Sequence, residues 1–205
     1  MSSPFFAVFT HLFSYKTIRL KGLFTNPEAF GSTYARESEF SAETWHSHLN
    51  TPGRTTLGAA KGGDEVEGEW IGTLSIFSPE MLAANPENRL SYPPNLREAE
   101  DEGVSAVYML VGMWVHSDYR RLGVGRALMD FALDAIKSFK SSQTEPGNTG
   151  GNEARSKAKF ALLEVHTANT AARKLYENAG FTIQDGSGAS DESEGGEMWM
   201  AMRLD

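Results

Sequence analysis

One stretch of the sequence combines arginines and glycines in a spacing that could hold a phosphate group. It reads Arg120-Arg121-Leu122-Gly123-Val124-Gly125, and a segment with helical periodicity follows it directly. Glycines at the start of a helix let backbone N–H groups come close to an anion, and the helix N-terminus adds about half a positive charge. The stretch therefore predicts a phosphate or pyrophosphate site, with an ordinary strand-to-helix turn as the alternative.

Two well-known phosphate-binding loops do not fit this stretch. A P-loop requires Gly-Lys-Ser/Thr, and no such triplet follows the glycines. A dinucleotide-binding G-x-G-x-x-G loop needs a small third residue for close packing of helix on strand, but position 128 is Leu128. We therefore expect neither a nucleoside triphosphate nor a nicotinamide dinucleotide at this position.

The R-x-x-G-x-G spacing instead resembles the acetyl-CoA pyrophosphate-binding motif of the GNAT superfamily of N-acetyltransferases. Downstream, E-V-H-T-A-N-T-A-A-R-K-L-Y-E-N-A-G-F looks like the second signature of that family, and upstream N-P-E-A-F-G-S-T-Y resembles its first helix. The similarity covers most of residues 15–204. It implies transfer of an acetyl group from acetyl-CoA to a primary amine by direct attack in a ternary complex.

The resemblance also implies which residues contact acetyl-CoA. In the family, the end of one strand binds the pantetheine arm, the glycine loop binds the diphosphate, and an Asn and a Tyr of the second signature lie beside the arm and its sulfur. Backbone N–H groups at the end of that strand could also polarise the thioester carbonyl. The corresponding residues here are Met113, Trp114, Val115, Arg120, Arg121, Leu122, Gly123, Val124, Gly125, Arg126, Ala127, Asn169, Ala172 and Tyr176.

Acetyl transfer to an amine further needs a general acid for the departing thiolate and a general base for the amine. Tyr176 matches the general acid of the family, and a phenol with a reference pKa of about 10 suits that role; a tyrosine that only packs is the alternative. Glu164, near the end of a predicted strand, is the expected base, because burial would raise the pKa of its carboxyl towards neutrality. His116, His166 and ordered water remain alternative bases.

Periodicity indicates the elements that position these residues. The expected fold class is α/β, a single mixed, mostly antiparallel central sheet flanked by helices, as in the GNAT family. The most apolar segment, 104–115, predicts a buried central strand. Further strands are expected at 15–20, 55–60, 69–77, 159–165, 181–184 and 198–204, and helices at 27–36, 42–49, 80–84, 125–140 and 170–179.

The domain organisation that we expect is simple. Residues 1–14 are read as an N-terminal tail and residues 15–205 as one GNAT-like domain. Within the domain, the low-complexity segment 141–157 is expected to be a flexible insertion. The Phe-rich N-terminus is expected to dock on the body of the protein or on a second subunit.

The charge of the 205-residue chain is −8, but it is unevenly distributed. Thirteen of the 27 acidic residues lie in three runs without a basic residue, at 64–69, 98–102 and 185–197, and we expect these runs to be loops. An acidic chain is not expected to bind nucleic acid. Because the loop at 185–197 sets acceptor specificity in the GNAT family, we hypothesise a cationic acceptor; loops that only aid solubility are the alternative.

The sequence also indicates which cysteine and metal sites, and which cellular location, are expected. The chain has no cysteine, which excludes disulfides, thiolate zinc sites and a cysteine nucleophile. His46 and His48 lie two residues apart on a predicted helix, point in different directions and are read as surface residues, so no metal site is expected. Without a basic signal region or a long apolar run, a cytoplasmic location with no membrane partner is expected.

Three functional classes remain compatible with the sequence. The leading class is a catalytic N-acetyltransferase, with a homodimer as a compatible assembly because many relatives are dimers. The second class is an acyl-CoA-binding protein that has lost turnover. The third is an interaction protein that docks through its acidic loops and Phe-rich N-terminus. Binding of acetyl-CoA separates the first two classes from the third.

Overall fold

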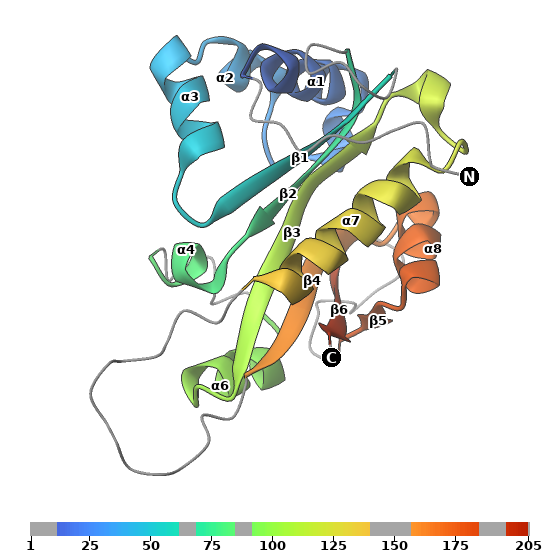
Figure 1. Ribbon diagram of the computed structural model, residues 1–205. Coiled ribbons are helices and arrows are strands. Elements are labelled where there is room, and N and C mark those ends of the chain that lie inside the picture. The colour runs from blue at the N-terminus through green and yellow to red at the C-terminus, as the bar shows by residue number, and fades with distance from the viewer. Residues whose placement is uncertain (1–11, 62–68, 85–91, 140–156, 185–195, 205) are drawn as a thin grey trace.

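The computed structural model describes residues 12–61, 69–84, 92–139, 157–184 and 196–204. They form one six-stranded sheet in the order β1-β2-β3-β4-β6-β5 (Figure 1). Only the β3–β4 pair is parallel. The expected mixed, mostly antiparallel sheet is therefore confirmed. The strands are β1 (Arg54–Ala60), β2 (Trp70–Phe77), β3 (Ser105–Val115), β4 (Ala158–His166), β5 (Thr182–Ile183) and β6 (Glu197–Leu204).

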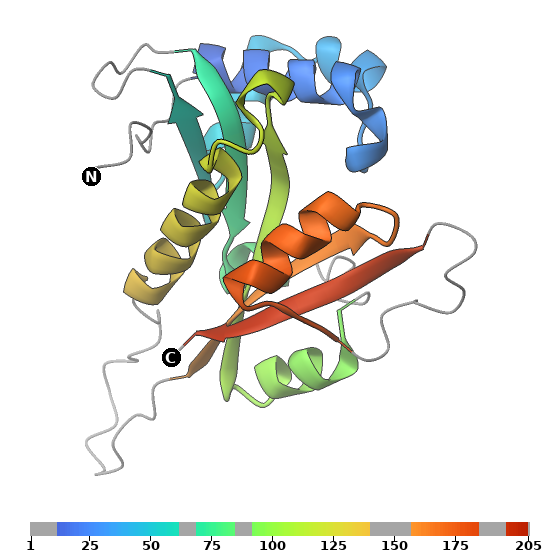
Figure 2. The same ribbon diagram turned by 90° about the vertical axis from the view of Figure 1, so that its right-hand side faces the viewer.

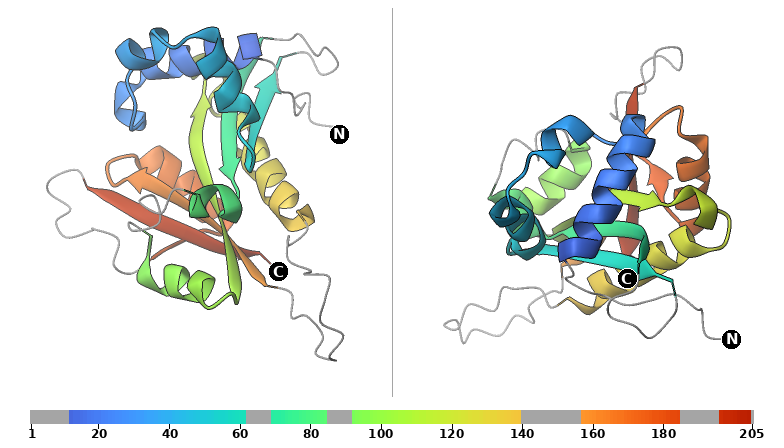
Figure 3. Two further views of the ribbon diagram at one scale, coloured as in Figure 1. Left: turned by 90° about the vertical axis from the view of Figure 1, so that its left-hand side faces the viewer. Right: turned by 90° about the horizontal axis from the view of Figure 1, so that it is seen from above.

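Helices cover both faces of the sheet. Helices α7 and α8 lie on one face, and α1 to α3 lie together at the end of the sheet formed by β1 and β2 (Figures 2 and 3). The α-helices are α1 (Leu12–Thr25), α2 (Tyr34–Ser38), α3 (Ala42–Asn50), α4 (Pro79–Ala83), α6 (Pro94–Asp101), α7 (Val124–Ser138) and α8 (Thr170–Ala179), with 3-10 turns η1 (Pro27–Ala29) and η2 (Ser117–Tyr119).

The largest apolar cluster lies between the sheet and helices α7 and α8. Helix α7 presents buried Val124, Leu128, Ala132 and Ile136 at spacings of four residues, so one stripe of the helix packs against the strands. Full burial of one such leucine or isoleucine contributes about 1.5–3 kcal/mol. This packing fixes the start of α7 relative to the end of β3.

Two smaller clusters cover the opposite face of the sheet. One joins α1 and α3 to the strands through residues such as Ile18, Trp45 and Trp114. The other joins α4 and α6 to the strands through Leu82, Leu96 and their neighbours. The sheet is therefore buried on both faces, as the apolar character of segment 104–115 predicted.

The strand expected at 15–20 is wrong, because this segment lies in helix α1. Its short alternation of polar and apolar residues suggested a strand, but the buried residues Tyr15, Ile18, Gly22 and Leu23 recur at helical spacing. The helix also begins at Leu12, inside the expected N-terminal tail. The helix expected at 27–36 is two elements, η1 and α2, because Phe30 is extended and Thr33 caps α2 by accepting a hydrogen bond from Arg36 N.

One acidic run was also assigned wrongly. Residues 98–101 form the second half of helix α6 rather than a loop. Residues 64–68 and 185–195 of the other two runs lie outside the described residues, as do the first 11 residues and nearly all of the expected insertion at 141–157. Within the described ranges, no helix is both long and apolar enough to cross a membrane.

Candidate functional site

Strands β3 and β4 are paired along only part of their length. Their register runs from Ser105 opposite Ala158 to Met109 opposite Leu162. Strand β3 then has an extra residue relative to β2, near Gly112, whose φ is +64°. A β-bulge bends its strand; beyond it β3 stays paired with β2 and β4 with β6, so β3 and β4 diverge (Figure 2).

A cleft of about 470 Å³ opens where the two strands diverge. It is lined by strand β3, strand β4 and the start of helix α8, and by β1, β2 and helices α1 to α3 on the other side. A concave site of this size is suited to a small-molecule ligand. Among the residues expected from sequence, the cleft brings together Met113, Glu164, Asn169, Ala172 and Tyr176.

Glu164 shares the cleft with a second carboxylate, Glu197. In the antiparallel β4–β6 pair, Glu164 lies opposite Trp199 and Glu197 opposite His166, so the two glutamates are diagonal neighbours on one face. Glu164 is exposed towards the open cleft, but partial desolvation there, together with the negative charge of Glu197 and a hydrogen bond between the two carboxyls, raises the pKa of Glu164 to about 7. Glu164 can therefore exchange a proton near neutral pH.

Tyr176 lines the same cleft from helix α8, with 8% of its surface exposed. Its ring packs near that of Phe181, with 6.1 Å between ring centroids. Burial raises the pKa of Tyr176 to about 12, because the phenolate would be poorly solvated. The hydroxyl therefore keeps its proton at neutral pH and can donate it.

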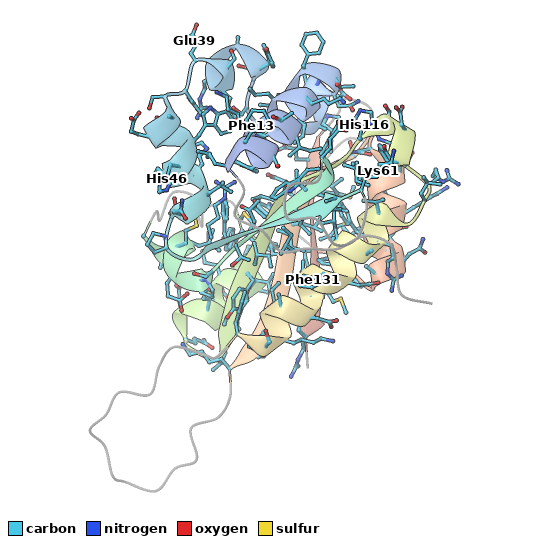
Figure 4. The ribbon with its side chains drawn as sticks, turned by 45° about the horizontal axis from the view of Figure 1, so that its top comes forward. Phe13, Glu39, His46, Lys61, His116 and Phe131 are labelled. Atoms are coloured by element: carbon cyan, nitrogen blue, oxygen red, sulfur yellow. The ribbon has the colours of Figure 1, made fainter. Side chains whose placement is uncertain are left out.

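The two histidines considered as alternative bases differ in position. His166 lines the cleft, and its Nδ1 accepts a hydrogen bond from Ala168 N at 3.3 Å. His116 does not line the cleft; its Nδ1 accepts from Asp118 N at 3.2 Å and so caps turn η2. It lies at the end of β3, on the same side of the molecule as Lys61 (Figure 4). His166 therefore remains an alternative base, whereas His116 has a structural role.

The two histidines of helix α3 also differ in position. His46 is exposed on α3, as expected (Figure 4). His48 was read as a surface residue, but it lines the cleft, and burial together with the charge of Arg54 lowers its pKa. Among the described residues, no group of three or more potential ligands could hold a metal ion.

The loop from Arg120 to Gly123 leads into helix α7 and contains two residues in the left-handed region. Arg121 has φ of +63° and Gly123 has φ of +86°. Gly123 caps the helix without a side-chain hydrogen bond, and the hydrogen bond from Ala127 N to Gly123 O at 3.0 Å starts the intrahelical series. The backbone N–H groups in the first turn of α7, which come before Ala127 N, have no intrahelical acceptor and can bind an anion. Consecutive N–H groups of this kind form anion-binding concavities.

The three arginines around this loop are not equivalent. Arg120 donates from Nε to Val115 O at 2.9 Å and from Nη2 to Asn26 Oδ1 at 2.7 Å. Arg126 donates from Nε to Asp130 Oδ1 at 2.7 Å and from Nη1 to Asn178 O at 3.2 Å. Arg121 is exposed and has no side-chain partner among the described residues. It is therefore the arginine most available to a bound diphosphate.

Several residues expected to contact acetyl-CoA contribute to the site by packing or through backbone atoms rather than through polar side chains. The side chain of Trp114 does not line the cleft; it packs in the apolar cluster of α1 and α3 and donates from Nε1 to Asn26 Oδ1 at 3.1 Å, which leaves its backbone for a ligand. A Cβ added to Gly125 would lie 3.3 Å from Leu175 Cδ2 and Met113 Cε, so glycine allows α7 to approach α8 and β3. Val124 is buried, whereas Leu122 is exposed.

Two kinds of cleft residue are not indicated by the sequence. Glu197 was expected in the acidic loop at 185–197, but it is the first residue of β6 and contacts Glu164. Tyr15, Arg19 and Arg54 were not singled out, although all three line the cleft. No local motif marks these residues, because the sheet brings them to the cleft from distant parts of the chain.

Comparisons with known proteins agree with this arrangement. Residues 94–183 match the family model of the acetyltransferase (GNAT) domain. No curated protein matches the sequence. Among solved structures, Arabidopsis thaliana NAA60 in complex with a bisubstrate analogue superposes with a TM-score of 0.58 at 12% identity, covering 98% of this chain and 97% of that chain.

Two further structures share the fold over similar lengths. The acetyltransferase of the GNAT family from Streptococcus pneumoniae gives a TM-score of 0.54 at 16% identity, with 93% of this chain and 94% of that chain covered. The NatC complex bound to Gag peptide and CoA gives 0.53 at 16% identity, with coverage of 95% and 91%. Residues 94–183 thus match the GNAT acetyltransferase domain, and the chain shares the fold of these acetyltransferase structures.

Proposed function

We propose that this protein transfers an acetyl group from acetyl-CoA to a primary amine by direct attack in a ternary complex. The observation that carries the proposal is the pair of Glu164 and Tyr176 in one cleft, with pKa values of about 7 and about 12. One group can accept a proton at neutral pH and the other can donate one. Structures with the same fold hold acetyl-CoA, as in Arabidopsis thaliana NAA60, or CoA, as in the NatC complex, which supports this choice of acyl donor.

The residues around the cleft fit acetyl-CoA. The left-handed loop at Arg121 and Gly123, with the first turn of α7, would hold the diphosphate through backbone N–H groups and the Arg121 side chain. The diverging end of β3, from Met113 to Val115, would bind the pantetheine arm. Asn169 Oδ1 accepts a hydrogen bond from Ala172 N at 3.1 Å, so its amide NH₂ remains to donate to the arm. Acetyl-CoA supplies the acetyl group as a reactive thioester.

The chain's own residues account for the proton transfers. An amine arrives as an ammonium ion, and Glu164 accepts one of its protons. The neutral nitrogen then bonds to the acetyl carbon as the carbon–sulfur bond breaks, while backbone N–H groups of β3 stabilise the carbonyl oxygen. Tyr176 donates its hydroxyl proton to the sulfur. The second proton of the nitrogen restores Tyr176, and Glu164 releases its proton to solvent, so the reaction yields an amide, a thiol and one proton.

The position of Glu197 supports a base function for Glu164 rather than for His166. Desolvation and the nearby carboxylate of Glu197 both disfavour ionisation of Glu164, and together they raise its pKa to about 7. The same pair of carboxyls is suited to an incoming ammonium group. We therefore assign Glu164 as the general base and Glu197 as the residue that tunes its pKa.

The proposal is tested by measuring acetyl-CoA binding and amine-dependent release of CoA on the same protein. At 100 times its Kd, a ligand adds about 2.7 kcal/mol to the free energy of unfolding, which a thermal shift detects. We expect this shift, and thiol release when a panel of primary amines is added. A shift without thiol release for any amine would instead indicate an acyl-CoA-binding protein without turnover. No shift would contradict both functions.

A further inference from the structure

The cleft contains a second polar site, on the side formed by β1 and β2. Arg54, the first residue of β1, lines the cleft and is partly buried. Its Nη2 donates to Tyr15 Oη at 2.6 Å and to Ser75 Oγ at 3.3 Å, and its Nε donates to Thr56 Oγ1 at 3.3 Å. The guanidinium also lies 5.5 Å from the Tyr15 ring centroid and 5.3 Å from that of Phe77. Neutral groups therefore hold this cation in one position.

The charge of Arg54 has no carboxylate partner within the described residues. Arg19, which lines the same cleft, pairs with Glu37 through two hydrogen bonds of 3.0 and 2.7 Å, so that carboxylate is already engaged. Glu28 is exposed and accepts a hydrogen bond from Asn26. His48 supplies no negative charge. A partly buried cation without a counter-charge is costly, and an anionic group of a ligand would compensate it.

The sheet register gives the separation between this cation and the proposed base. Ser75, which binds Arg54, is paired with Val111 of β3. If the parallel register that ends at Met109 and Leu162 were continued, Val111 would be level with Glu164. Ser75 and Glu164 are therefore two strand spacings apart, about 10 Å, and further where the strands diverge.

We infer that the acceptor is an amine that also carries a carboxylate, with the amine facing Glu164 and Glu197 and the carboxylate bound by Arg54. This inference rests on the proposed function. The Nη1 donors of Arg54 have no partner among the described residues, and a guanidinium matches the geometry of a carboxylate. A separation of about 10 Å suits an amine and a carboxylate joined by several bonds. A polyamine would instead bring a second ammonium group towards Arg54.

A homologous series of substrates tests the inference. We would measure kcat/KM for thiol release with saturating acetyl-CoA, using ω-amino carboxylates with two to eight methylenes, the matching ω-amino carboxamides and α,ω-diamines. For the longer members, we expect the carboxylate to be preferred over its carboxamide by about tenfold or more, since a charge-assisted hydrogen bond is lost in the amide. We expect Arg54→Gln to abolish this preference by lowering the rate with the carboxylates, in a protein that still binds acetyl-CoA.

The controls separate charge recognition from folding. Arg36 is exposed on α2 and does not line the cleft, so Arg36→Gln makes the same change of charge and should keep the preference. Arg54→Lys keeps the positive charge and should keep part of the preference; it also serves if Arg54→Gln does not fold. The inference would be overturned by equal rates for carboxylates and carboxamides, or by a preference for diamines. It would also be overturned by an unaltered preference in the Arg54 variants, or by no reaction with any member of the series in a protein that binds acetyl-CoA. Failure to bind acetyl-CoA would contradict the proposed function instead.

Discussion

At the scale of single residues, the most informative feature is the contact between Glu164 and Glu197. Two carboxyls that share a hydrogen bond cannot both be ionised easily, so one of them keeps a proton at a pH where an isolated glutamate has lost it. Desolvation is the largest cause of the raised pKa of Glu164, and Glu197, 33 positions further along the chain, adds to it.

This contact predicts the pH dependence of the reaction. A base must be deprotonated to act, so kcat/KM should rise with pH along a limb centred near 7, the pKa of Glu164. Glu197→Gln removes the neighbouring negative charge, lowers the pKa of Glu164 and should move this limb to lower pH. Glu164→Gln should remove the limb and most of the activity. A limb at the same pH in wild type and Glu197→Gln would contradict the assignment.

Tyr176→Phe tests the general acid. Loss of a positioned proton donor typically costs about 10²–10⁴-fold in rate, so kcat should fall by at least about 10²-fold. Acetyl-CoA affinity should change little, because the ring and its packing against Phe181 are kept. Tyr34→Phe is a matched control, because Tyr34 is 43% exposed on α2 and lies outside the cleft. Wild-type kcat in Tyr176→Phe would assign this tyrosine to packing.

At the scale of elements, the backbone conformation at the start of α7 is proposed to determine how well the diphosphate of acetyl-CoA is bound. Gly123→Ala places a side chain at φ of +86°, with no atom within 4 Å of the new Cβ, so its direct effect is backbone strain. A left-handed non-glycine residue costs about 1–2 kcal/mol. We expect this loss of stability together with weaker acetyl-CoA binding, measured by calorimetry.

A second glycine provides the matched control. Gly103 follows helix α6, has φ of +71° and also has no atom within 4 Å of a new Cβ. Gly103→Ala should therefore destabilise the fold by a similar amount without changing acetyl-CoA affinity. Equal effects of the two variants on affinity would show that the loop before α7 does not hold the diphosphate.

The elements that could be predicted from the sequence are those with a long, clear period. Helices α7 and α8 and strands β1 to β4 follow the expected ranges closely, with Asn169 as the N-cap and Gly180 in the left-handed C-terminal position of α8. The segment at 15–20 was too short to distinguish alternation from a helical stripe. Helix α6 was missed because its surface is mostly charged and only Leu96 is buried.

At the scale of the whole molecule, the two halves of the cleft differ in how far sequence could predict them. The side proposed to bind the cofactor comes from contiguous motifs, so Met113, Asn169 and Tyr176 could be placed before the structure was known. The other polar residues come from distant elements and meet only through the sheet register. Arg54 of β1 lies on the side formed by β1 and β2, and Glu197 of β6 lies beside Glu164, and no spacing in the chain indicates that they share a site.

The most direct test of acetyl transfer in this cleft is to follow both products in one sample. Wild-type protein, acetyl-CoA carrying a labelled acetyl group and a primary amine would be incubated together, with the acetylated amine measured by mass spectrometry and free CoA by thiol release. We predict equal amounts of the two products in wild type and a large loss of both in Glu164→Gln and Tyr176→Phe, which should still bind acetyl-CoA. Labelled amide formed at the wild-type rate by both variants would contradict the account.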